Sequence, residues 1–75
     1  MSNADRVYKY MQDFGSITTF EAFRDLGITR LSAYIYILIH RGVDIHSDYI
    51  SIINRYGKMI RCKRYRITEE KNNDT

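Results

Sequence analysis

The chain has 75 residues, of which 44% are hydrophobic and 13% aromatic, and its formal net charge is +3. This length fits one domain, and the hydrophobic content is sufficient for a core, which argues against a disordered chain. The single cysteine, Cys62, excludes an intramolecular disulfide and a multi-cysteine zinc site. The lone cysteine favours a reduced, intracellular setting. No apolar run reaches the ~20 residues of a membrane span, so we expect no membrane contact.

Positive charge is concentrated in one segment of the chain. Residues 1–48 hold five basic and six acidic residues, whereas residues 49–68 hold six basic residues and no acidic one. A nearly neutral body with one strongly basic segment is typical of a protein that binds a polyanion. Charged edge strands that prevent aggregation are the alternative, but six cations without an anion exceed what that role needs.

The first helix is predicted over residues 3–14, where apolar side chains recur at helical spacing, and Gly15 follows as its stop. The stripe consists of Val7, Tyr10, Met11 and Phe14. Residues 16–18 are largely β-branched and too few for a helix, so they are predicted as a short strand.

Two further helices are predicted from capping signals. Thr18 and Glu21 form a capping-box pattern ahead of the second helix, which Gly27 ends; its candidates for burial are Phe20, Ala22, Phe23 and Leu26. Thr29 is placed to N-cap a third helix over residues 30–41, which Gly42 ends; its inward stripe is Leu31, Ile35 and Leu38. The one-turn gap between these two helices is helix-turn-helix spacing.

Helical periodicity ends at Val43, and the remainder predicts a hairpin. Residues 44–46 form a short extended stretch, residues 49–53 and 59–68 are β-rich, and residues 54–58 supply turn chemistry. We therefore predict an α+β fold, a winged helix-turn-helix domain over residues 1–68 with three helices and a small antiparallel sheet. Residues 16–18 are its third strand, and residues 69–75 are a polar, disordered tail.

The chain resembles a known family in its turns and in the helix-turn-helix. The residues that carry the likeness are Gly15-Ser16-Ile17-Thr18, Leu26-Gly27-Ile28-Thr29-Arg30-Leu31-Ser32-Ala33, Gly42, Ile45, Asn54-Arg55-Tyr56-Gly57 and Tyr65-Arg66-Ile67. From about Val7 to Ile67, it is similar to the small winged helix-turn-helix proteins common in bacteriophages and prophages. The resemblance implies duplex DNA as the partner, a role as a phage or prophage regulator or architectural factor, and the cytoplasm of a bacterial host.

The candidate DNA contacts lie on the third helix and the hairpin. On the helix, Arg30 can pair with guanine, and Ala33 or Ile37 can meet a thymine methyl group; Tyr36 and His40 share this side. The hairpin cations suit phosphates, and the helix N-termini at Thr18 and Thr29 can offer backbone N–H groups. The hairpin set comprises Arg55, Tyr56, Lys58, Arg61, Lys63 and Arg64.

Two binding alternatives remain open at this stage. The third helix departs from the family pattern by carrying Tyr34, Ile37 and Ile39, so the chain can instead be a protein-interaction module, such as a phage-encoded inhibitor or adaptor. A homodimer or protein partner would then use Tyr36, Ile37 and Ile39. Binding of left-handed DNA or RNA is a further option, without a Trp or Pro in the wing to support it.

No enzymatic chemistry is expected. His40, His46 and Cys62 fall on three different predicted elements, and no fourth ligand or base completes a site. We expect no catalytic residue, no metal and no cofactor.

Overall fold

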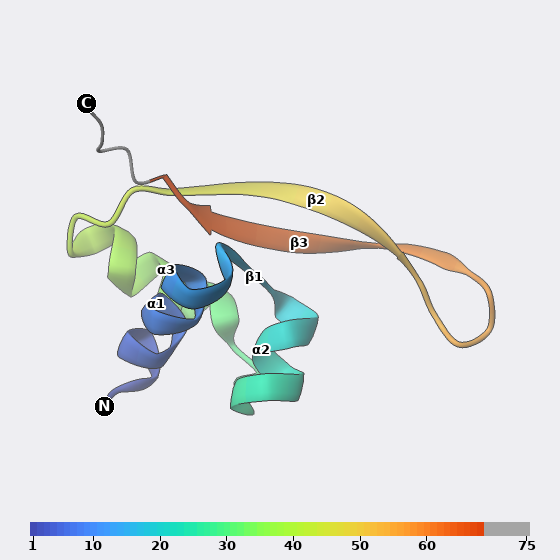
Figure 1. Cartoon of the computed structure of the whole chain (residues 1–75), viewed down its shortest axis with the longest axis horizontal. Helices are drawn as coiled ribbons and strands as arrows, with labels where there is room; N and C mark the ends of the chain where they lie inside the picture. Colours follow the sequence, from blue (N-terminus) through green and yellow to red (C-terminus); the bar gives the residue numbers. More distant parts are fainter. Residues whose placement is uncertain (69–75) are drawn as a thin grey trace.

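The computed structural model describes residues 1–68, so the predicted tail over residues 69–75 lies outside the described residues. In chain order the elements are α1 (Asn3–Phe14), β1 (Ser16–Thr18), α2 (Thr19–Leu26), α3 (Leu31–His40), β2 (Ile45–Ile53) and β3 (Met59–Ile67), as Figure 1 shows. The predicted α+β fold, with three helices and a three-stranded antiparallel sheet, is confirmed.

The sheet has the strand order β1-β3-β2. It is three-stranded only where β1 pairs with residues 64–66 of β3, a part that we call its root. β1 pairs with β3 over three positions, from Ser16 opposite Arg66 to Thr18 opposite Arg64. β2 and β3 pair along their whole length, from Ile45 opposite Ile67 to Ile53 opposite Met59. Beyond β1 the hairpin therefore continues as a two-stranded ribbon that projects past the helices (Figure 1).

β2 is longer than the sequence indicated. Residues 44–46 and 49–53 were separate extended stretches in the prediction, but β2 runs without a break through Ser47 and Asp48. Asp48 has a poor intrinsic preference for strands. Its carboxylate is held by Arg64 directly opposite on β3, at 2.7 and 3.0 Å, and this cross-strand pair stabilises the position.

The core lies between α1, α3 and the root of the sheet. Val7 and Met11 of α1, Ile17 of β1 and Leu38 of α3 are its largest fully buried side chains, and Tyr65 of β3 completes it from above. The predicted inward stripe of α3 is confirmed, since Leu31, Ile35 and Leu38 are all buried.

The burial predicted for α2 is only partly correct. Ala22 is buried and Leu26 is half-buried, but Phe20 and Phe23 are 53% and 61% exposed. Ala22 and Leu26 are four residues apart and share one helical face, and this short helix packs against the body through that face. The sequence predicts Phe14 in the apolar stripe of α1, but it is likewise exposed at the end of that helix.

One of the two predicted threonine caps is confirmed and the other is wrong. Thr18 caps α2: its hydroxyl accepts from the Glu21 N–H, and its own N–H donates to the Glu21 carboxylate, both at 3.0 Å. The N-cap of α3 is Arg30, without a side-chain cap, so the helix begins one residue later than predicted, and Thr29 precedes the cap. A cap that sequence reasoning missed is Ser2, which forms a capping box with Asp5 at the start of α1.

Replacement of Thr18 by Ala is therefore expected to lower the free energy of unfolding by ~1 kcal/mol, because the Glu21 N–H loses its acceptor. For a domain of this size the melting temperature falls by roughly 4–8 °C per kcal/mol. Thr29→Ala is the matched control: Thr29 is exposed and caps nothing, so this variant should melt like the parent. Circular dichroism melts check both, and equal losses in the two variants would contradict the cap assignment.

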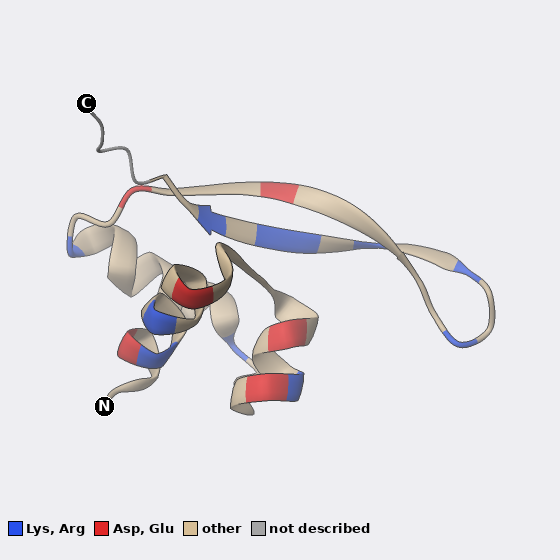
Figure 2. Cartoon of the chain, viewed as in Figure 1, with Lys and Arg blue, Asp and Glu red and all other residues tan. Residues whose placement is uncertain are grey.

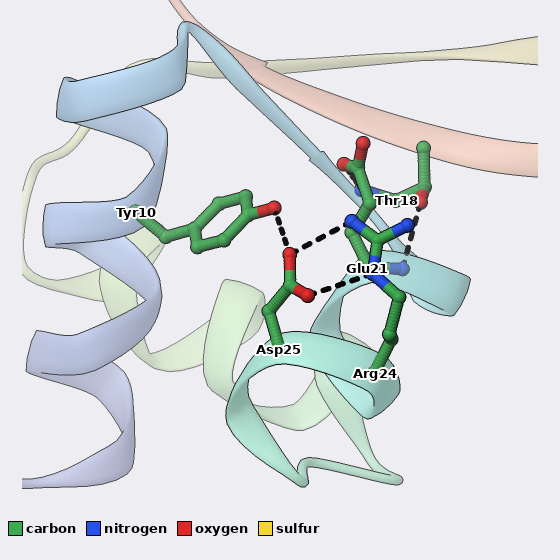
Figure 3. Close-up of polar contacts among 5 residues, drawn as sticks. All are labelled: Tyr10, Thr18, Glu21, Arg24 and Asp25. Carbon is green, nitrogen blue, oxygen red and sulfur yellow. Dashed lines mark hydrogen bonds and ion pairs between the residues drawn. The ribbon is translucent and has the colours of Figure 1, made fainter.

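A polar network joins α1 to α2 (Figure 3). The Tyr10 hydroxyl donates to the Asp25 carboxylate at 2.5 Å, and Arg24 donates to the same carboxylate through Nε and Nη2 at 2.7 and 2.9 Å. The hydrogen bonds from Arg24, and then the one from Tyr10, lower the pKa of Asp25 to about 2. Burial, and then the hydrogen bond to Asp25, raise the pKa of Tyr10 to about 12.

This network predicts a measurable acid dependence of stability. The pKa of Asp25 is lower in the folded chain than the ~3.9 expected of an unfolded one, so its contribution is present above about pH 4 and is lost as the pH falls from about 4 to about 2. The difference in melting temperature between the parent and Asp25→Asn should shrink across that window. Asp13→Asn is the control, because Asp13 forms an exposed pair with Lys9 at 3.5 Å that contributes little. A difference independent of pH would contradict the role of the Asp25 carboxylate.

Candidate nucleic-acid interface

The β2–β3 register distributes the basic side chains over two faces of the hairpin. Successive side chains of a strand point to opposite faces. Arg61 and Lys63 share the face of the buried Tyr65, whereas Arg64 and Arg66 lie on the opposite face. Figure 2 shows Lys and Arg along β3 and at the hairpin tip, while the acidic residues lie on α1, α2 and β2 and in the loop before β2. The six cations therefore cannot all meet one flat partner.

Arg64 is held by a carboxylate within the sheet. Its Nε and Nη2 donate to the two Asp48 oxygens at 3.0 and 2.7 Å, and Arg66 lies 3.9 Å from the same carboxylate. The hydrogen bond from Arg64 lowers the pKa of Asp48, and the same bond raises the pKa of Arg64. Asp48 directly precedes residues 49–68, which contain no acidic residue. The pairing of β2 with β3 places its carboxylate beside Arg64 and Arg66. Arg64 is therefore already paired, and its phosphate contact, which would have to displace Asp48, stays a prediction.

Arg61 and Lys63 are arranged around an aromatic ring. The Arg61 guanidinium lies 4.5 Å from the centre of the Tyr49 ring, and the Lys63 ammonium lies 5.8 Å from that ring and 5.6 Å from the Tyr65 ring. A cation over an aromatic face keeps its charge and loses side-chain freedom. These contacts hold two long side chains along one face of the ribbon.

The tip of the hairpin is a turn organised by Asn54. The Asn54 side-chain oxygen accepts from the N–H groups of Tyr56 and Lys58 at 2.9 and 3.0 Å, and its backbone N–H donates to the Lys58 carbonyl at 2.9 Å. Gly57 has a φ of 78°, a conformation that favours glycine. Arg55, Tyr56 and Lys58 are all exposed on this turn.

The residues assigned to the outward side of α3 are mostly exposed. Arg30, Tyr36, Ile37 and His40 are exposed, and Ala33 is half-buried. The rings of Tyr36 and His40 lie 4.3 Å apart in an edge-on arrangement. Arg30 stands at the N-terminal boundary of the helix, not within it.

The threonines contribute less to this surface than expected. Thr18 is 5% exposed, and the Glu21 capping box already engages both its hydroxyl and its N–H, so its N–H is not free for the phosphate contact expected of it. Thr29 is exposed ahead of α3 but caps no helix.

The described part of the chain gives no sign of a membrane span or a metal centre. None of the helices in residues 1–68 is long and apolar enough to cross a membrane. In the same residues, no three His, Cys, Asp or Glu side chains come together where they could hold a metal ion.

The comparisons with known proteins agree with this architecture. A family model described as a winged helix-turn-helix domain matches residues 2–70, almost the whole chain. No curated protein and no solved structure gives a significant match. The matched range includes all three helices, the connecting strand β1 and the complete hairpin. The chain therefore belongs to the winged helix-turn-helix domain family.

Proposed function

We propose that this protein binds duplex DNA, with the outward side of α3 in the major groove and the basic hairpin on the sugar–phosphate backbone. The observation that carries the proposal is a set of four cations on the ribbon that form no ion pair within residues 1–68. They are Arg55, Lys58, Arg61 and Lys63, which we call the ribbon cations. Clustered Lys and Arg side chains of this kind supply the affinity for phosphates that is independent of sequence.

The helix has little with which to read bases. On its outward side, Arg30 is the residue suited to a bidentate contact with guanine, and Ile37 offers an apolar contact for a thymine methyl group. Tyr36 and His40 supply the remaining polar atoms. We therefore infer that phosphate contacts dominate the binding free energy and that discrimination between sequences is modest.

The biological role we propose is that of a non-enzymatic phage or prophage regulator, or an architectural factor, in the cytoplasm of a bacterial host. It rests on the family membership, since winged helix-turn-helix domains are DNA-binding modules, and on the resemblance to small phage and prophage proteins. Modest base reading with strong backbone contacts suits an architectural factor as well as a regulator.

A second candidate is a protein-interaction module, favoured by the apolar surface of α3. Tyr36, Ile37 and Ile39 are 64%, 40% and 48% exposed, which is unusual for a helix that contacts only DNA and water. Such a module would hold a protein partner or a second copy through these three residues. It would show little affinity for DNA at any salt concentration.

Fluorescence anisotropy of a labelled duplex, titrated with the full chain at two salt concentrations, separates the two candidates. DNA binding through the ribbon cations predicts affinity that falls steeply with salt. Weak binding that is insensitive to salt, from a sample with a cooperative melting transition, would overturn the proposal and leave the protein-interaction module.

A further inference from the structure

An apolar groove runs beside the projecting part of the hairpin. Its wider end has a volume of about 750 Å³ and is lined by Phe20 of α2, by Ile52 and Ile60 of the hairpin, and by the tip residues Ile53, Asn54, Arg55 and Tyr56. A narrower part of about 400 Å³ is lined by Thr19, Phe20, Ile52 and residues 60–63 of β3. Because Phe20, Ile52 and Ile60 line both parts, they form one groove, which we call the Phe20 groove.

The narrower part of the Phe20 groove follows an unpaired edge of β3, whereas the wider end is lined by Ile60 of β3 and by residues 52–56 of β2 and the tip. β1 ends its pairing at Thr18, opposite Arg64, and the chain turns into α2 at Thr19. Within residues 1–68, no strand pairs with residues 59–63 on this side. Successive side chains of a strand point to opposite faces, so a space lined by four consecutive residues of β3 must lie along the strand edge. This narrower part occupies the position that a longer β1 would take.

The lining of the groove is mostly apolar, and all of its charged residues are positive. Phe20 and Ile60 are 53% and 43% exposed, and the charged lining residues are Arg55, Arg61 and Lys63, with no Asp or Glu among the lining residues. A nucleic-acid backbone gains nothing from an apolar floor. A second copy inserting its own hairpin would bring like charges together. The chemistry that fits is apolar and acidic at once.

We propose that the Phe20 groove binds an extended, acidic and apolar segment of a partner protein, which adds to the free edge of β3 as a further strand. The backbone of that segment would pair with residues 59–63, its apolar side chains would cover Phe20 and Ile60, and its carboxylates would face Arg61 and Lys63. Strand addition of this kind takes affinity from main-chain hydrogen bonds and specificity from alternate side chains. The free edge corresponds to an extended segment of roughly 17 Å. The proposal does not depend on DNA binding, but the groove shares Arg55, Arg61 and Lys63 with the ribbon cations, so the acidic segment and duplex DNA would compete for these side chains.

The proposal is tested by titrating the ¹⁵N-labelled full chain with a capped peptide of about eight residues that alternates Val and Glu. Chemical-shift changes are expected to concentrate at residues 59–63 and Phe20, and the affinity should fall as salt is added. Phe20→Ser should weaken peptide binding roughly tenfold, since the ring forms the shared floor of the groove. Phe23→Ser is the matched control: Phe23 is 61% exposed on the same helix, lies outside the groove, and its loss should leave the affinity unchanged.

Several outcomes would overturn the proposal: shifts located elsewhere, equal affinity for a peptide that alternates Val and Lys, or equal losses in Phe20→Ser and Phe23→Ser. Shifts that grow with protein concentration alone would identify a second copy as the occupant, and shifts produced only by duplex DNA would identify nucleic acid; either result also rejects the peptide. The affinity of Phe20→Ser for duplex DNA, measured by anisotropy, should equal that of the parent. Failure of the groove and failure of DNA binding are thereby distinguished.

Discussion

Replacement of the four ribbon cations, Arg55, Lys58, Arg61 and Lys63, by Gln is expected to remove most of the affinity for duplex DNA and nearly all of its salt dependence. Each neutralised phosphate releases about 0.9 counterion, so four contacts give a slope of log K against log salt of roughly −3.6. With that slope, the parent loses roughly 100-fold in affinity between about 50 and 200 mM salt. The fourfold variant should lose only a few-fold over the same range. Anisotropy titrations with one labelled duplex measure both slopes.

The matched control for this variant removes one cation of β3 together with the carboxylate that neutralises it. Asp48→Asn combined with Arg64→Gln deletes the cross-strand pair and leaves the net charge as it was. Because Asp48 already neutralises Arg64, the salt slope of this double variant should not fall below that of the parent, and the loss of the weaker 3.9 Å pair with Arg66 can only add a free cation. A slope that falls by a full unit would show that Arg64 contacts phosphate, and an unchanged slope in the fourfold variant would place the DNA on another surface.

The helices could be predicted from the sequence because their boundaries depend on local chemistry. The Thr18–Glu21 capping box and the glycine stops at Gly15 and Gly27 each depend only on residues a few positions away in the sequence. The structure confirms all three. The cap at Thr29 failed for an equally local reason. Arg30 adopts a φ of −121° and a ψ of 58°, and its carbonyl accepts from Ala33, so the first turn of α3 starts one residue later.

The candidate site was less predictable, because it depends on strand register. Residues 49–68 contain six cations and no acidic residue. Because successive side chains of a strand point to opposite faces, the sequence alone predicts that these cations lie on both faces of the hairpin. Only the pairing of β2 with β3 shows that Asp48 lies opposite Arg64, which reduces the free cations on the ribbon. Phe20 and Phe23 are exposed because of where the short helix α2 packs in the fold. The pattern of apolar residues in the sequence does not predict that position.

Replacement of Ile17 by Ala is expected to have the largest effect on stability among single substitutions in the sheet. Ile17 is fully buried and is paired with Tyr65 in the middle of β1, where the hairpin joins the helices. Removing a buried Ile side chain to Ala costs about 2–5 kcal/mol, as lost transfer free energy plus the cavity left behind. For a domain of this size each kcal/mol lowers the melting temperature by roughly 4–8 °C, so a fall on the order of 10–20 °C or more is expected.

An Ile-to-Ala substitution near the tip of the hairpin serves as the control. It distinguishes the loss of the β1–β3 anchor from the loss of apolar side-chain surface in general. Ile53 is the last residue of β2, is 68% exposed and pairs with Met59 beside the tip, so Ile53→Ala should stay within about 0.5 kcal/mol of the parent. Chemical denaturation of both variants gives the two free energies of unfolding.

A two-stranded hairpin alone is marginally stable in water, so the ribbon depends on its three-stranded root to keep its shape. Ile17→Ala should therefore also weaken DNA binding under conditions where part of the sample is unfolded, and full DNA affinity should return as the temperature is lowered. Equal stability of Ile17→Ala and Ile53→Ala would show that the β1–β3 junction does not anchor the hairpin.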